Sequence, residues 1–101
     1  MTAEITFFSA AGDAAPSDAV QFSCDIMTFQ FYGTWDGGQA QVEISVDGTN
    51  YEAVEDAVFT EDSNVNIEAA PACYIRANIT SVGGSTSLTV VANRKQRIGV
   101  L

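Results

Sequence analysis

The sequence contains no histidine, and only four of its 101 residues are basic. Without histidine the chain has no Ser-His-Asp triad, no imidazole general base and no ordinary zinc site. Thirteen acidic residues leave a net charge of −9, and a surface this negative repels nucleic acid and anionic membranes. We therefore expect neither nucleic acid nor a membrane as a partner.

Cysteine and long apolar runs are also scarce. No apolar stretch approaches the ~20 residues of a transmembrane helix, and the N-terminus lacks the basic region of a signal peptide. The two cysteines, Cys24 and Cys73, alternate in phase with apolar neighbours, so we interpret them as buried thiols, with a disulfide as the alternative. They form no CxxC motif, and no glycine-rich loop precedes a helix, so we expect no metal and no cofactor.

Alternation of apolar and polar residues is the dominant pattern in this chain. It is strict in residues 41–47 and recurs in residues 64–69, 73–80 and 87–90. In residues 26–35 it places Met27, Phe29 and Phe31 on one face, which we expect inside. With short turns between the runs, the sequence predicts a single all-β domain over residues 1–101. We expect an antiparallel β-sandwich or barrel, jelly-roll or Ig-like, with about seven to nine short strands.

Two stretches carry more specific structural predictions. Asp47-Gly48 is the strongest hairpin signal, because a two-residue type I′ turn needs positive φ at both central positions and Asp and Gly tolerate it. Residues 50–60 favour two short strands with a kink near Glu55-Asp56, although a single helical turn is an alternative there.

Acidic residues are the main candidates for chemistry. Two carboxylates flanking a cleft would suit a glycosidase, but Glu43, Glu52 and Glu68 fall on the polar side of the alternation, where we expect water. Oxygen ligands for calcium cluster at residues 55–56 and 61–64 and at Asp47 with Asn50. We interpret these as polar turns, and a hydrolase stays the least favoured reading.

Three aromatic residues, Tyr32, Trp35 and Tyr51, are candidates for an exposed platform that stacks against sugar. The alternative is that they cover the edges of the core. A carbohydrate-binding module would need all three on one exposed face.

The C-terminal segment, residues 93–101, has an unusual composition. All 13 acids precede it, so residues 1–93 with one base, Arg76, carry a net charge of −12. The segment holds the other three bases beside an apolar end, which predicts either a final strand or a docking arm that binds an acidic neighbour or adds to a sheet edge. Its candidate partner-binding residues are Arg94, Lys95, Arg97, Ile98, Val100 and Leu101.

Four stretches together resemble small β proteins encoded among the virion genes of tailed bacteriophages. They are FYGTWDGG (31–38), QVEISVDGTNY (41–51), CYIRAN (73–78) and STSLTV (85–90). Within that group the chain looks most like a head decoration, or cement, protein.

The resemblance implies a non-enzymatic structural protein of the virion, made in the host bacterial cytoplasm. It would stabilise the head by bridging capsid subunits, without cofactors. Its expected partners are the major capsid protein, copies of itself as a homotrimer, or both. The alternatives are a small tail or neck component and a carbohydrate-binding β-sandwich module.

Overall fold

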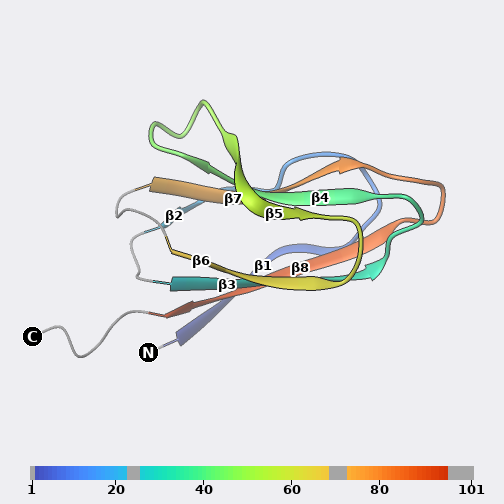
Figure 1. Ribbon diagram of the computed structural model, residues 1–101, viewed down its shortest axis with the longest axis horizontal. Coiled ribbons are helices and arrows are strands. Elements are labelled where there is room, and N and C mark those ends of the chain that lie inside the picture. Colours follow the sequence, from blue (N-terminus) through green and yellow to red (C-terminus); the bar gives the residue numbers. More distant parts are fainter. Residues whose placement is uncertain (1, 23–25, 69–72, 96–101) are drawn as a thin grey trace, which may run out of the picture.

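Two antiparallel four-stranded sheets face each other in a computed structural model that describes residues 2–22, 26–68 and 73–95 (Figure 1). Sheet A has the order β1-β8-β3-β6, from β1 (Thr2–Ala11), β8 (Ser87–Lys95), β3 (Ile26–Thr34) and β6 (Ser63–Ile67). Sheet B has the order β2-β7-β4-β5, from β2 (Val20–Phe22), β7 (Cys73–Ser81), β4 (Gln39–Ser45) and β5 (Glu52–Phe59). The predicted all-β class is confirmed, and the two separate sheets make it a sandwich. Within the described residues no helix is long and apolar enough to cross a membrane.

The core lies between the sheets and is built from alternate residues of each strand. Met27, Phe29 and Phe31 are buried as predicted, while Thr28 and Gln30 between them are exposed. Sheet B contributes smaller side chains from the opposite layer. The other buried apolar residues are Ala40, Val42, Ala57, Ile67, Cys73, Ile75, Ala77, Ile79, Leu88, Val90 and Ala92. Cys24 lies outside the described residues, so the disulfide alternative stays untested.

The type I′ geometry occurs at a different turn from the one predicted. Asp36 and Gly37 both have positive φ, 45° and 80°, and the Gly38 amide donates to the Trp35 carbonyl at 2.7 Å. This tight turn carries the chain from β3 in sheet A to β4 in sheet B. Local sequence shows that a turn needs positive φ, but it does not show which strands the turn joins.

The prediction of a two-residue turn at Asp47-Gly48 is wrong. The β4–β5 hairpin exists, but β4 ends at Ser45 and β5 begins at Glu52, so residues 46–51 form a wider loop. Gly48 has a φ of 78°, whereas Asp47 is not among the residues with positive φ. The physical reason is that side-chain oxygens of Ser45 and Asp47 accept the loop amides, which satisfies the backbone without a tight turn.

The kink predicted near Glu55-Asp56 is confirmed, and the helical alternative is wrong. Residue pairing along β5 jumps from Glu43↔Ala53 to Gln41↔Val58, so residues 54–57 bulge out of the ladder. Asp56 adopts a φ of 66° within this bulge, and Figure 1 shows the strand curling there. The bulge bends the edge strand of sheet B.

Edge strand β1 contains two irregularities in its pairing with β8. The register shifts between Thr6 and Phe8 and again between Phe8 and Ala11. At the second shift Ala10 has a φ of 52°, and its amide donates to Thr89 Oγ1 at 3.1 Å. A residue with a Cβ atom is strained in this left-handed conformation, by about 1–2 kcal/mol.

We predict that Ala10→Gly raises the free energy of unfolding by about 0.5–1 kcal/mol. Glycine relieves the left-handed strain at this position, and that gain exceeds the added entropy of the unfolded chain. Urea denaturation monitored by Trp35 fluorescence measures the change. Ala53→Gly, at an exposed position of β5 without positive φ, is the matched control and should be destabilising. Equal destabilisation by both changes would contradict the prediction.

Candidate functional site

The structure does not gather the three candidate aromatics on one face. Tyr32 is exposed on the outer side of β3 in sheet A. Tyr51 lies on the outer side of sheet B, where the Arg76 guanidinium carbon sits 3.8 Å from the centre of its ring. Trp35 follows β3 at the end of the sandwich, in the turn to β4. Tyr32 and Tyr51 lie on the outer sides of different sheets, and Trp35 lies in the turn at one end of the sandwich, so the three form no common platform.

Trp35 ties several loops together at its end of the molecule. Its indole Nε1 donates to Asp62 Oδ1 at 2.8 Å, and the Gly33 amide donates to the same oxygen at 3.2 Å. Thr86 Oγ1 donates to the Trp35 carbonyl at 2.8 Å. The residue is half-buried, which fits the reading that it covers the end of the core.

The expectation that Glu43 is solvated is wrong. Its position on the outer side of β4 was predicted correctly, yet only 5% of the residue is exposed. Arg76 Nε donates to its Oε1 at 2.8 Å, while Asn78 Nδ2 and Gln41 Nε2 donate to its Oε2 at 2.8 and 2.7 Å. Alternation predicts which face of the sheet a residue lies on. It does not predict whether side chains of a neighbouring strand bury that residue.

Glu43 has the electrostatics of a structural carboxylate. Burial alone would raise its pKa, but the hydrogen bonds from Asn78, Gln41 and Arg76 and the charge of Arg76 outweigh burial and lower it. A glycosidase general acid needs a raised pKa to hold its proton near neutral pH. The cluster therefore works against the acid role at Glu43. Glu52 and Glu68 are exposed, as expected.

Asp47 organises the exposed loop between β4 and β5. Its Oδ1 accepts the amides of Thr49 and Asn50 at 2.8 and 2.9 Å and the hydroxyl of Ser45 at 2.8 Å, while its Oδ2 accepts Asn50 Nδ2 at 2.9 Å. These hydrogen bonds stabilise the ionised carboxylate and hold the pKa of Asp47 well below its usual value. The largest contributions come from the backbone amides of Asn50 and Thr49. In the described part of the chain, no group of three or more Cys, Asp or Glu side chains is placed to hold a metal ion.

The basic C-terminal residues divide between the final strand and the undescribed end. Arg94 and Lys95 belong to β8, where they pair with Met27 and Ile26 of β3. Arg94 is half-buried, and its Nε is buried without a hydrogen-bond partner among the described residues. The remaining candidates, Arg97, Ile98, Val100 and Leu101, lie outside the described residues, so the docking role of this segment stays a prediction.

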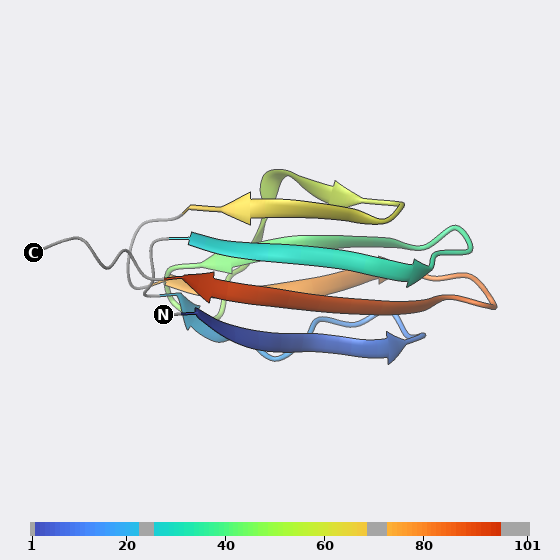
Figure 2. The ribbon, with the colours of Figure 1, turned by 90° about the horizontal axis from the view of Figure 1, so that it is seen from below.

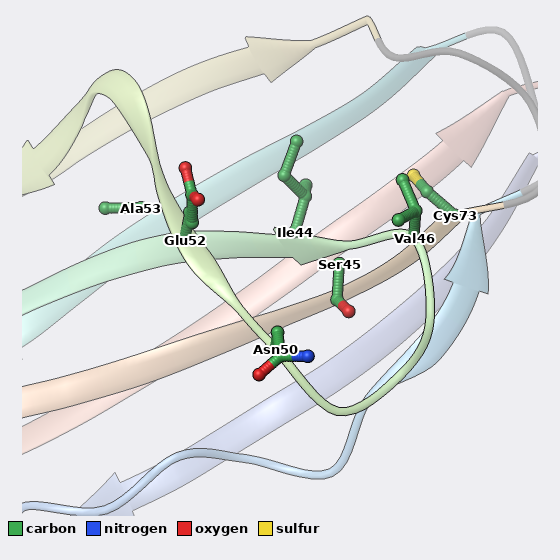
Figure 3. Close-up of a pocket in the computed structure, with 7 residues that line it drawn as sticks. All are labelled: Ile44, Ser45, Val46, Asn50, Glu52, Ala53 and Cys73. Atoms are coloured by element: carbon green, nitrogen blue, oxygen red, sulfur yellow. The ribbon is translucent and has the colours of Figure 1, made fainter.

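The surface of the described residues includes a pocket beside β4 and a groove on sheet A. A pocket of about 260 Å³ lies where β4 passes into the loop, and Figure 3 shows Ile44 and Val46 on one side of β4 and Ser45 on the other. Its lining is completed by Asn50, Glu52, Ala53 and Cys73. A shallow groove of about 530 Å³ crosses the outer face of sheet A, lined by Glu4, Ile26, Thr28, Gln30, Asn66, Val91, Ala92 and Asn93.

Comparison with known proteins gives a likeness in fold. No protein family model matches the sequence, and no curated protein matches it either. The crystal structure of the SPBc2 prophage-derived protein YomS superposes with a TM-score of 0.78 at 11% sequence identity. The match covers 93% of this chain and 92% of YomS. The two chains therefore share one sandwich fold over nearly their whole lengths.

We predict that Glu43→Ala lowers the free energy of unfolding by about 2–4 kcal/mol. The change leaves the donors of Arg76, Asn78 and Gln41 without their acceptor in a site that excludes most water. Urea denaturation checks the value. Glu55→Ala on the neighbouring strand removes an equal charge from an exposed position and should change stability by less than about 0.5 kcal/mol. Similar losses in both variants would contradict the structural role of Glu43.

We predict that stability falls as the pH drops below about 4.5. Glu43 and Asp47 both have pKa values lowered from ordinary values of 4.5 and 3.8. The folded state therefore favours their ionised forms, and this stabilisation is complete above those ordinary values. It is lost as the pH falls through the lower, folded-state values. Melting temperatures between pH 7 and pH 2 measure the effect, and Glu43→Gln should flatten part of the decline. An unchanged decline in Glu43→Gln would contradict the role of Glu43.

Proposed function

We propose that this protein is a structural component of a bacteriophage virion. Specifically, it acts as a capsid decoration protein that stabilises the head by bridging capsid subunits. The observation that carries the proposal is the fold it shares with a prophage-derived protein over nearly the whole chain. The sequence resemblance to virion proteins of tailed bacteriophages supports the same class of protein.

The described polar groups support a non-catalytic role. The buried carboxylate of Glu43 is ion-paired with Arg76, and Asp47 accepts four hydrogen bonds from Ser45 and its own loop. Both carboxylates therefore have a structural role in stabilising the sandwich. Many copies of such a rigid domain on a particle would act together through multivalency, even where each contact is weak.

The charge distribution suggests how the protein would attach. Acidic residues fill the body, while three of the four bases lie at the end of β8 and beyond it. We propose that Arg97 and the apolar residues Ile98, Val100 and Leu101 contact a neighbouring subunit, while Arg94 and Lys95 anchor the segment to sheet A. A tail or neck location would use the same segment on a different subunit.

Purified particles test the proposal and the role of the segment separately. We predict that mass spectrometry of particles from the phage or prophage that encodes the chain detects it in a fixed ratio to the major capsid protein. Its absence from intact particles would refute the virion role.

A variant lacking residues 96–101 retains all of β8 and should fold with an unchanged melting temperature, yet occupy particles at least tenfold less. The matched control is the full chain with Gln21→Glu, at an exposed position of β2, which lowers the net charge by one, as the loss of Arg97 does, and should leave occupancy unchanged. Full occupancy by the shortened chain would refute the segment's role while leaving the virion role intact.

A further inference from the structure

Figure 2 looks onto the four strands of sheet A. The charged residues of its outer face lie at one end, where Glu4 pairs with Asn93 and, one row further out, Lys95 pairs with Thr2 and Ile26. Strand pairing arranges its side chains in rows that cross β1, β8, β3 and β6. The first row is Glu4, Asn93, Thr28 and Asn66, and the second is Thr6, Val91, Gln30 and Asn64. Further along, Thr89 pairs with Tyr32 and Ser87 pairs with Thr34. Among these residues Glu4, at one corner, is the only charged one; we call the other eleven the neutral face.

Such a face is unusual for this chain. Charged residues make up 17% of this chain, with 13 acids among them, and soluble surfaces are designed with about 25–35% charged residues. Apart from Glu4 on β1 and Glu68 after β6, the described acids lie away from sheet A: on β5, in turns such as the one at Asp36, in the other loops, and in the Glu43 cluster of sheet B. The neutral face is therefore a separate surface with its own chemistry.

The neutral face combines ordered polar groups with partly exposed apolar ones. Thr28 Oγ1 donates to Asn66 Oδ1 at 2.8 Å across two strands. Val91 is half-buried at the centre, and Tyr32 is 41% exposed further along β3. Threonine methyl groups and these side chains offer apolar contact, while Gln30, Asn64 and Asn93 offer hydrogen bonds. Non-obligate interfaces are about as apolar as the rest of a protein surface, so a mixed face of this kind is compatible with a weak interface.

We propose that the neutral face binds the same face of a second copy of this chain. Two copies that each carry −9 repel each other, and contact through the neutral face keeps most of their acids apart, where salt screens them. A twisted sheet is saddle-shaped, so two such faces fit when their strands cross at about −30° or about 90°. The contact is isologous, and it generates a two-fold pair.

The area available limits the contact. Three strands of nine or ten residues and the five-residue β6, spaced about 4.8 Å apart and rising about 3.3 Å per residue, cover on the order of 500 Å² per copy. The pair would bury about 1,000 Å² in total, at the lower limit of specific interfaces. The pair is therefore weak and concentration-dependent. This inference does not rest on the virion role, and a two-fold pair differs in mass from the trimer that the resemblance implies.

Sedimentation equilibrium of the full chain, up to roughly 1 mM, tests the pair. We expect a monomer–dimer equilibrium that strengthens between about 0.05 and 0.5 M NaCl, because salt screens the repulsion between acidic copies. Gln30→Glu and Gln30→Lys should each weaken association at least tenfold, since the two-fold axis brings both copies of the new charge close together. Asn93→Lys on the same face is the second test. Gln21→Glu and Gln21→Lys, exposed on β2 of sheet B, are the matched controls and should leave association unchanged.

Several results would overturn the proposal. A chain that stays monomeric at the highest concentration and salt would refute it, and so would a trimer that all Gln30 variants leave intact. Equal effects at Gln30 and Gln21 would show a general response to net charge. If the isolated chain is monomeric and Gln30→Glu instead lowers its occupancy on particles, the face binds another subunit. Melting curves confirm that each variant is folded.

Discussion

Four phenylalanine rings pack in series between the two sheets, and the remaining contacts of the sandwich are arranged around them. Phe7 of β1 stacks on Phe29 with ring centroids 5.2 Å apart, Phe29 lies 6.2 Å from Phe31, and Phe31 lies 5.1 Å from Phe59 of β5. The first three rings come from sheet A and the last from sheet B, so the series joins the layers. Each such aromatic pair contributes about 0.5–1.5 kcal/mol beyond the burial of its apolar surface.

The position of Phe59 also explains the irregular path of β5. The bulge at residues 54–57 divides the strand into a part that pairs beside Glu43 and a part that pairs beside Ala40. The second part delivers Phe59 to the core. Before the first part, Tyr51 lies against Arg76, whose guanidinium binds Glu43. β5 therefore contacts the apolar core through Phe59. On the outer side of sheet B, the residue that precedes β5 contacts the buried ion pair.

The local pattern of the sequence predicts the faces of the strands but not their partners. Alternation identified the inward positions of β3 and the kink of β5, because both depend on neighbouring residues. It did not reveal that β3 and β4 belong to different sheets, and so it assigned the type I′ turn to the wrong Asp-Gly pair. The same limit explains the candidate site: Tyr32 and Tyr51 are separated by sheet assignment, and Glu43 is buried by Arg76 and Asn78, which lie more than 30 positions later in the chain.

The distribution of charge determines which surfaces are open to association. Edge strands invite pairing with other chains, and proteins protect them with charges, bulges and short lengths. β5 carries Glu52, Glu55 and Asp56 and is kinked, β2 and β6 are short, and β1 is bulged twice. With the edges protected in this way, strand addition is disfavoured, and the neutral face of sheet A is the surface that offers contact without charge. Association through that side keeps every backbone ladder intact, so copies can pair while the edges of the sandwich stay closed to aggregation.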